Sequence, residues 1–132
     1  MVCLQGSAPR FRRGMLILMA ILFAMPSPLL AQALSGEKLF RNQCAACHSL
    51  VAGEVRVGPS LHGLAGRKAG TLAGFSYSPA LRKARLRWKS DTLDKWLTDS
   101  GAFVPGSMMN FRQADAAKRA EIIAFLLENQ SN

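Results

Sequence analysis

The chain has 132 residues, a formal net charge of +9 and three cysteines. This length leaves room for one small domain and excludes a multidomain architecture. A positive charge of this size suits acidic partners or nucleic acid, but the sequence contains no nucleic-acid recognition motif, no internal repeat and no low-complexity tract.

Residues 1–33 have the layout of a secretory signal peptide. An arginine-containing start precedes an uncharged apolar run from Met15 to Met25, and Ala31-Gln32-Ala33 has the small-x-small form of a cleavage site. We therefore expect a cleaved leader and a domain of residues 34–132. Retention as a membrane anchor is the alternative, because two leucines shortly after the run could lengthen it.

Cleavage would also remove Cys3. The expected domain then keeps two cysteines, Cys44 and Cys47, which lie within one motif, so no other pair is left for a disulfide. It keeps 14 of the 17 basic residues and all eight acidic ones, so its net charge is +6. A domain this small without a disulfide often depends on a bound group for its stability.

The segment Cys44-Ala45-Ala46-Cys47-His48 is the pattern through which c-type haem is attached covalently. On a helix, positions i, i+3 and i+4 share a face, so both sulfurs can reach one edge of the porphyrin and the imidazole can reach the iron. A thioredoxin-like redox pair or half of a zinc site is the alternative, but no βαβ pattern surrounds the motif and no second cysteine pair completes a zinc site. The motif predicts one covalent haem c with His48 as the proximal ligand.

The residues around the motif predict a helix followed by a long loop. Ser35 as N-cap and Glu37 in the first turn predict a helix from about Gly36 into the motif, with Phe40 on the face of the cysteines. Six glycines and no hydrophobic period between residues 49 and 74 predict a loop that wraps the haem.

The second half of the chain predicts further short helices. Ser78-Pro79 reads as the N-cap and first residue of a helix to about Ala84. Ser90 is expected to cap the next helix and Gly101 to stop it. Between these two helices lies a basic run, interpreted as solvated surface: Arg82, Lys83, Arg85, Arg87 and Lys89.

A loop from Phe103 to Phe111 precedes the last predicted helix, which starts near Asp115. Its inner face is expected to consist of Ile122, Phe125 and Leu126. No segment shows the period of a strand, so the sequence predicts an all-α domain.

The second axial ligand has few candidates. The expected domain contains the methionines Met108 and Met109 and the histidines His48 and His62. A methionine in a loop after Pro-Gly is out of place as a core residue but suits a thioether that reaches for iron, and His/Met ligation raises the reduction potential. Spacing alone does not choose between the two methionines. Ligation by His62, or simple packing of both methionines on apolar surface, is the alternative.

Together the motifs resemble the soluble class I cytochromes c of mitochondria and the bacterial periplasm. The resemblance runs from Gly36 to about Glu128 and is carried, in order, by GEKLF before CAACH, VGPSLHGLAGRKAG, GFSYSPAL, RWKSDTLDKWL, FVPGSMMNF and IIAFL. It implies crossing N- and C-terminal helices, shorter central helices and a long Gly-rich loop round one haem. It also implies that Gly36 and Phe40 contact Ile122 and Phe125.

The resemblance implies roles for individual residues. The family's ligand methionine lies three residues after the glycine of the Pro-Gly loop and two before a phenylalanine, which points to Met109 between Gly106 and Phe111. Pro59 matches the proline whose carbonyl accepts the Nδ1–H of the proximal imidazole. Four residues match contacts of the haem propionates, which are carboxylates that need donors when buried: Arg67, Tyr77, Ser78 and Trp88.

The chain also departs from the mitochondrial pattern. Trp96 stands beside the haem where mitochondrial members place a tyrosine near the methionine sulfur, and its indole lacks the hydroxyl. Leu81 replaces an asparagine that helps to hold a buried water in many members. Lysines of mitochondrial members, two of them in the partner-docking ring, are replaced by Gln43, Gly101 and Met108, so a mitochondrial-type docking surface is not expected.

The expected function is one-electron transfer in the periplasm by a monomer, without enzymatic activity, because both axial positions of the iron are filled. Expected partners are a quinol:cytochrome c reductase, a terminal oxidase or a periplasmic dehydrogenase. A membrane-anchored cytochrome subunit of a redox complex is the alternative. A haem peroxidase is a further alternative, and it would need an open iron site.

Overall fold

A computed structural model describes residues 28–128, with side chains from residue 35 onward. Apart from one isolated bridge between Lys68 and Arg87, the described residues contain no β-structure. The all-α prediction is therefore confirmed. The helices of the described range are α1 Pro28–Gln43, α2 Pro79–Lys83, α3 Ser90–Thr98, α4 Ser100–Phe103 and α5 Ala116–Glu128.

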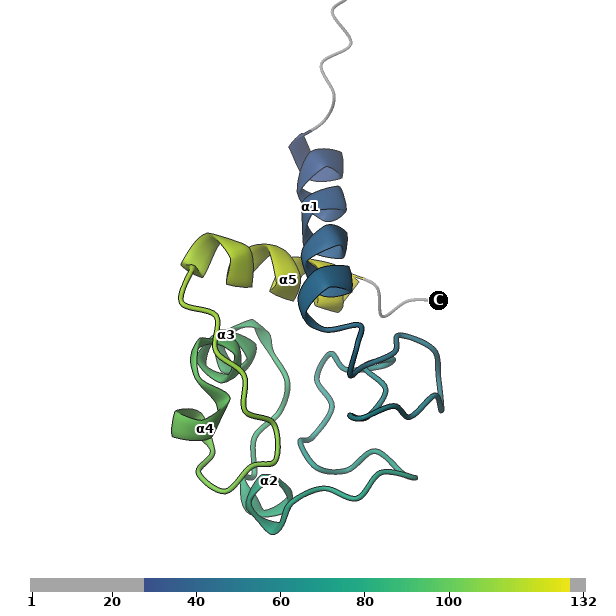
Figure 1. Cartoon of the computed structure of the whole chain (residues 1–132), viewed down its shortest axis with the longest axis vertical. Helices are drawn as coiled ribbons and strands as arrows, with labels where there is room; N and C mark the ends of the chain where they lie inside the picture. Colours follow the sequence, from purple (N-terminus) through teal and green to yellow (C-terminus); the bar gives the residue numbers. More distant parts are fainter. Residues whose placement is uncertain (1–27, 129–132) are drawn as a thin grey trace, which may run out of the picture.

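The first and last helices, α1 and α5, cross at one end of the molecule (Figure 1). A Cβ atom on Gly36 would lie 2.4 Å from the carbonyl oxygen of Glu121, so glycine is required for this close approach. Beside it, the rings of Phe40 and Phe125 pack with their centroids 5.5 Å apart. The expected contact between the terminal helices is present.

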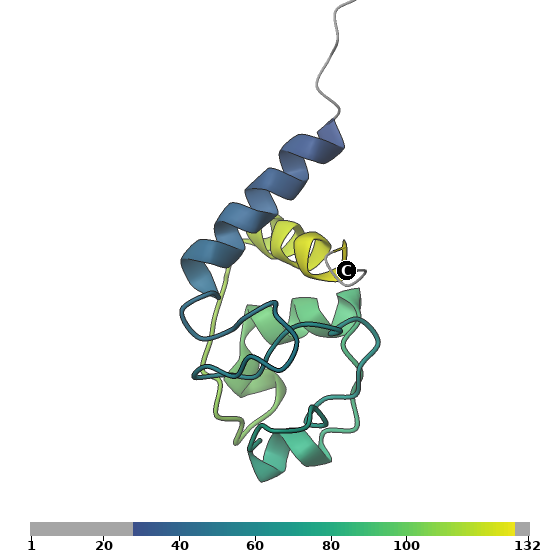
Figure 2. The ribbon, with the colours of Figure 1, turned by 90° about the vertical axis from the view of Figure 1, so that its right-hand side faces the viewer.

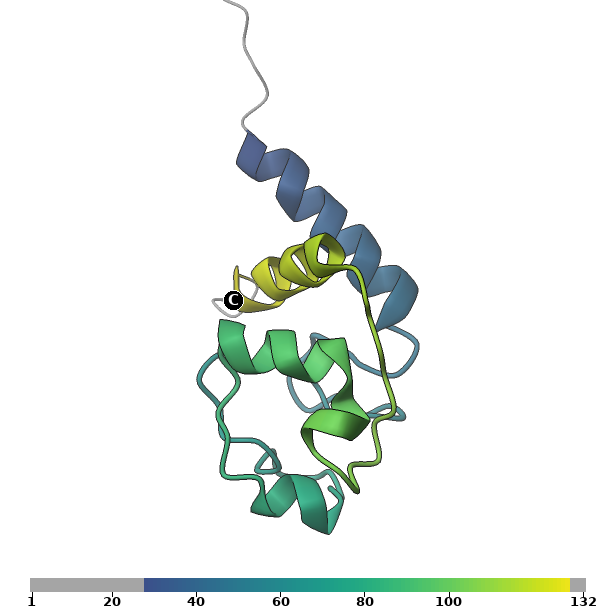
Figure 3. The same ribbon diagram turned by 90° about the vertical axis from the view of Figure 1, so that its left-hand side faces the viewer.

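The remaining helices and the long loop form the other part of the molecule. Helix α3 lies next to α5, whereas α2 lies at the end away from α1 (Figures 2 and 3). The segment between α1 and α2 has no regular helix or strand, as the glycine-rich composition predicted. Gly70, with φ of 70°, lets this loop approach α2 closely, since a Cβ there would lie 2.8 Å from Cα of Arg82.

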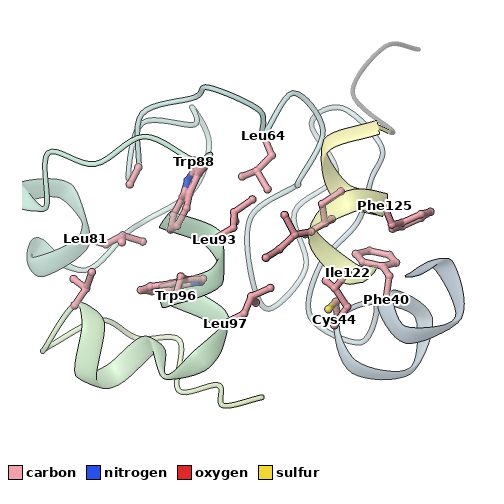
Figure 4. Close-up of a cluster of buried hydrophobic side chains, with 14 residues drawn as sticks. Phe40, Cys44, Leu64, Leu81, Trp88, Leu93, Trp96, Leu97, Ile122 and Phe125 are labelled. Atoms are coloured by element: carbon pink, nitrogen blue, oxygen red, sulfur yellow. The ribbon is translucent and has the colours of Figure 1, made fainter. Parts of the chain in front are cut away.

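The core joins both parts of the molecule. Figure 4 shows Phe40 and Cys44 near Ile122, with Trp88 and Trp96 on the other side of the cluster. The two tryptophans pack edge to face with centroids 5.4 Å apart. Cys44 and Trp88 therefore belong to one buried cluster, although 43 positions separate them in the sequence.

The start of the first helix was predicted wrongly. Helix α1 begins at Pro28 rather than near Gly36, because residues 29–34 (LLAQAL) are strong helix formers that extend it toward the N-terminus. Ser35 is therefore not an N-cap, and its hydroxyl donates to the Glu121 carboxylate of α5. The expected boundary between residues 33 and 34 falls within α1, while the earlier part of the predicted leader lies outside the described residues.

Two predictions around α3 also need correction. The N-cap is Lys89 and not Ser90, because the Thr92 hydroxyl accepts the Lys89 backbone N–H at 2.9 Å. Gly101 does not stop α3, which ends at Thr98. Asp99 adopts an extended backbone and its carboxylate accepts the N–H of Ala102 at 2.9 Å, which starts α4 with Gly101 inside it.

Two helix starts are confirmed. The Ser78 hydroxyl accepts the N–H of Leu81 at 3.2 Å and caps α2, with Pro79 as the first helical residue. The Asp115 carboxylate accepts the N–H of Ala117 at 2.9 Å at the start of α5.

Candidate haem site

The ring of His48 is half-buried and held by the backbone that follows it. Its Nδ1 lies 2.8 Å from the carbonyl oxygen of Pro59, the partner that the resemblance implied. A Cβ on Gly58 would lie 2.3 Å from Cε1 of the same ring, so the backbone presses against the imidazole. Burial lowers the pKa of His48, which favours the neutral form that metal ligation requires. With Nδ1 donating to Pro59, Nε2 is the nitrogen left for a metal.

The two cysteines continue the helical course of α1. The backbone N–H of Cys44 donates to the carbonyl of Phe40 at 2.8 Å, and the backbone N–H of His48 donates to the carbonyl of Cys44 at 2.9 Å. Cys44 is buried and Cys47 is exposed. Burial raises the pKa of Cys44 to about 11, so this thiol is protonated at neutral pH. A redox-active pair requires a thiolate, so the environment of Cys44 disfavours the thioredoxin-like alternative. Among residues 35–128, no third histidine, cysteine or carboxylate joins the pair to form a zinc site.

A polar cluster that the sequence analysis missed ties the following loop to the motif. Arg56 donates from Nη1 to the carbonyl of Ala45 at 2.6 Å and forms an ion pair with Glu54 at 2.8 Å. The Glu54 carboxylate also accepts the Ser49 hydroxyl at 2.6 Å. This hydrogen bond, followed by that from Arg56, lowers the pKa of Glu54. The composition gave no signal for the cluster, because Glu54 and Arg56 look like ordinary loop charges.

The two loop methionines have different environments. Met108 is 78% exposed, whereas Met109 is half-buried and packs against the core cluster. The turn before them is set by Pro105-Gly106, since Gly106 has φ of 85° and the N–H of Ser107 donates to Val104 at 3.0 Å.

Ser100 fixes the backbone from Met109 to Phe111. Its fully buried hydroxyl donates to the carbonyl of Met109 at 2.8 Å and accepts the N–H of Phe111 at 2.8 Å. The backbone N–H of Ser100 also donates to the carbonyl of Phe111 at 3.1 Å. The sequence analysis missed this residue, because a serine after an aspartate carries no local sign of burial.

Arg67 and Tyr77 lie near each other, as expected for a shared anionic group. Arg67 is half-buried and donates to the carbonyls of His62 and Ser60 at 2.7 and 3.1 Å. Burial lowers the pKa of Arg67 and raises the pKa of Tyr77. The electrostatic interaction between the two side chains partly offsets both of these pKa shifts. The rings of Tyr77 and Phe75 pack edge to face with their centroids 4.8 Å apart. His62, the alternative axial ligand, is half-buried in the same loop, where its N–H donates to Ser60 at 3.1 Å.

Trp88 is placed by a short pairing of two extended segments. Its N–H donates to the carbonyl of Arg67 at 2.9 Å, and its carbonyl accepts from Gly66 at 2.8 Å. Side chains of such a pair alternate between two faces. Trp88 is buried and Arg67 half-buried, whereas Lys68 and Arg87 are exposed. Ser78, the other propionate candidate, is buried and already serves as the α2 cap.

The comparisons with known proteins agree with this geometry. A family model described as "Cytochrome C oxidase, cbb3-type, subunit III" matches residues 31–126. Cytochrome c of Arabidopsis thaliana is 43% identical over 102 residues, which are 76% of this chain and 91% of the relative. Cytochrome c2 iso-2 of Magnetospirillum fulvum is 49% identical over 84 residues, 63% of this chain and 88% of the relative.

The chain belongs to the class I soluble c-type cytochromes. Among solved structures, cytochrome cH from Methylobacterium extorquens matches with a TM-score of 0.66 and 41% identity, over 71% of this chain and 95% of that one. The cytochrome binds one covalent haem c and transfers electrons, and it is not an enzyme. This excludes the peroxidase alternative.

The residues of the chain fit this cofactor. Covalent attachment needs two reduced cysteines, because each adds its sulfur and hydrogen across a haem vinyl group, and iron needs a neutral imidazole whose other nitrogen is fixed. The free cysteines Cys44 and Cys47 and the His48–Pro59 hydrogen bond meet these needs. Between residues 28 and 128, no helix combines the length and apolarity that crossing a membrane requires.

Proposed function

We propose that this electron carrier works in the periplasm, with the haem bound through Cys44 and Cys47 and the iron ligated by His48 and Met109. The main support is the hydrogen bond between His48 Nδ1 and the Pro59 carbonyl at 2.8 Å. It fixes the tautomer and orientation of the ring and directs Nε2 toward the metal. Export by residues 1–33 would bring the chain to the compartment where the haem is attached.

The choice of Met109 as distal ligand has support beyond the family spacing. Its side chain packs against the core, whereas that of Met108 points to solvent. The buried Ser100 hydroxyl holds the carbonyl of Met109 in place. A thioether ligand stabilises ferrous iron and raises the reduction potential.

The chain's own residues prepare the site for repeated one-electron transfer. The bound haem supplies an iron that cycles between the ferric and ferrous states. Filling both axial positions leaves no open site for a substrate. The aromatic wall of Trp88 and Trp96 excludes water from one side of the pocket. Arg67 and Tyr77 provide donors and positive charge for the propionates.

The proposed ligation predicts different effects for the two loop methionines. Met109→Ala should abolish the far-red Met–Fe(III) absorption band and lower the reduction potential, because a thioether is lost from the iron. Met108→Ala is the matched control and should keep the band. A pyridine haemochrome spectrum of each variant verifies that the haem remains attached. An intact band in Met109→Ala, or a high-spin ferric spectrum of the wild type at neutral pH, would refute His/Met ligation.

A membrane-anchored subunit of a redox complex is the second candidate. The matching family model is described as an oxidase subunit, and α1 runs without a break across the expected cleavage site. The intact mass of the protein purified from its native cells decides between the candidates. We expect a chain that begins at residue 34 and carries one haem. Its expected redox partners are a quinol:cytochrome c reductase, a terminal oxidase or a periplasmic dehydrogenase. A mass that includes residues 15–30 would support the anchored subunit.

A further inference from the structure

One continuous segment in the middle of the chain has a strongly one-sided charge. Residues 55–90 contain eight basic residues and no acidic residue. Seven of these basic side chains are exposed, and six of the seven take part in no ion pair of the described residues, the exception being Arg56. We call this set the basic wall: Lys68, Arg82, Lys83, Arg85, Arg87 and Lys89.

The basic wall lies on the outer side of the segment that carries Trp88, which the family resemblance places against the haem. From Ala84 to Lys89 the chain alternates, so that Arg85, Arg87 and Lys89 are exposed while Leu86 and Trp88 turn inward. The bridge between Arg87 and Lys68 brings a further cation to the same outer face. Arg87 is also fixed, because its Nη1 donates to the carbonyl of Gly66 at 2.8 Å.

The cations of α2 extend this face. Arg82 and Lys83 lie in the last turn of α2, at the end of the molecule away from α1 (Figure 1). Arg85 follows with φ of 51°, the one positive value among the described non-glycine residues, and turns the chain from α2 into the extended segment. The nearest acidic residue in sequence is Asp91, in the first turn of α3.

We propose that the basic wall is the docking surface for an acidic face of a redox partner protein. Guanidinium groups bind carboxylates in bidentate geometry, and opposite charges steer the encounter and raise its rate. A partner docked there would be separated from the haem pocket by the single chain layer that carries Trp88. This inference rests on the proposed function, since it assigns the partner of the same haem site.

The composition of the wall favours a protein over a membrane as its occupant. Binding of a peripheral protein to a bilayer usually combines cations with apolar side chains that enter the interface. The exposed large hydrophobic residues of the described chain are Val51, Val55, Val57 and Met108, and none of them belongs to the basic wall. Two lysine positions of the mitochondrial docking ring carry Gln43 and Gly101 here, so docking through a ring of the mitochondrial type is not expected.

The test uses the haem-containing protein on a gold electrode coated with a carboxylate-terminated monolayer, which imitates an acidic protein face. The triple variant Arg82→Glu, Lys83→Glu, Lys89→Glu reverses half of the wall. We expect its interfacial electron-transfer rate to fall at least tenfold and the wild-type rate to decrease as salt rises from 20 to 200 mM. The matched control Lys38→Glu, Arg112→Glu, Lys118→Glu makes the same charge change on exposed residues elsewhere and should stay within twofold of the wild type.

Other results would overturn the proposal. Equal losses in both triple variants would mean that net charge, rather than this surface, governs docking. Binding of the wild type to phosphatidylglycerol vesicles at 150 mM salt, lost in the wall variant, would make the occupant a membrane. Failure of the proposed function is distinguishable, because it appears in the wild type alone, as a high-spin ferric spectrum or as a mass that includes residues 15–30, whereas the docking proposal is judged by comparing the two triple variants.

Discussion

At the scale of single residues, Ser100 shows how a ligand loop can be held without a covalent bond. The loop from Val104 to Phe111 has no helix or strand, and the Ser100 hydroxyl joins the carbonyl of Met109 to the N–H of Phe111, on either side of Asn110. A hydroxyl is suited to this place because it donates and accepts at once. A single buried oxygen atom therefore makes two of the hydrogen bonds that hold this loop.

Ser100→Ala should loosen the Met109 loop while leaving the rest of the cytochrome folded. The change removes a donor to Met109 and leaves the N–H of Phe111 without its acceptor, a cost of about 1–3 kcal/mol. In a urea titration, the far-red Met–Fe(III) band should disappear at lower urea than the far-UV circular dichroism signal. Ser107→Ala is the control, because the Ser107 hydroxyl makes a longer contact of 3.2 Å to Met109. Coincident loss of both signals in Ser100→Ala would show that Ser100 does not act on the loop alone.

At the scale of helices, the crossing of α1 and α5 allows no side chain at position 36. In Gly36→Ala the new Cβ would lie 2.4 Å from the backbone of Glu121 and 2.8 Å from Cβ of Phe125, so α1 must shift. We expect a loss of about 1–3 kcal/mol in the free energy of unfolding, measured by urea denaturation of the haem-containing protein. Gly101→Ala is the control, since its nearest neighbours are 3.7 Å away. Equal stability of Gly36→Ala and the wild type would contradict the observed packing.

A second contact between elements depends on Arg119 of α5. Its buried guanidinium donates to Asp94 of α3 at 2.7 Å and to the carbonyls of Gln113 and Ala114 at 2.9 Å. Arg119→Met should lower the free energy of unfolding by about 1–3 kcal/mol, because two carbonyls lose their donor. Asp94→Asn should cost less, about 1 kcal/mol or below, because Asp94 is half-exposed. Thermal unfolding of both variants tests this order, and the reverse order would contradict it.

The helices that sequence alone predicts well are those with strong local signals. Ser78-Pro79 and Asp115 mark the starts of α2 and α5 because the capping chemistry is contained within a few residues. Gly101 was misleading because the side chain of Asp99 starts a new helical turn just before it. The roles of Ser100 and Arg119 could not be predicted from the sequence, because they depend on contacts that form only after the chain has folded.

The candidate haem site also contains residues that the sequence predicts and contacts that it does not. The motif and the family pattern named His48, Pro59 and Met109, and the structure places His48 on Pro59 and Met109 against the core. Ligation by His48 and Met109 and the propionate roles of Arg67, Tyr77, Ser78 and Trp88 stay predictions. Trp96 packs on Trp88, which the sequence could not have indicated.

At the scale of the whole molecule, we expect the fold to depend on the haem as part of its core. The long loop between α1 and α2 has few regular elements of its own, and no disulfide closes it among the described residues. A domain of this size gains little from its apolar core alone. The bound porphyrin supplies the apolar surface on which this loop can pack.

Removing the attachment should therefore unfold the protein. In the double variant Cys44→Ala, Cys47→Ala we expect most of the helical far-UV signal to be lost and tryptophan fluorescence to rise, because the haem no longer quenches Trp88 and Trp96. His62→Ala should keep the haem and the wild-type spectra. A double variant that stays helical without haem would show that the polypeptide core suffices.

The alternation between Arg67 and Lys68, and between Arg87 and Trp88, has an evolutionary consequence. Substitutions at the outward positions can alter the partner without disturbing the haem, since those side chains do not enter the pocket. A single inserted or deleted residue near Arg87 would exchange the two faces and turn Arg87 inward and Trp88 outward. In divergent descendants of this protein, the length of these two segments should therefore vary far less than the identity of their exposed residues.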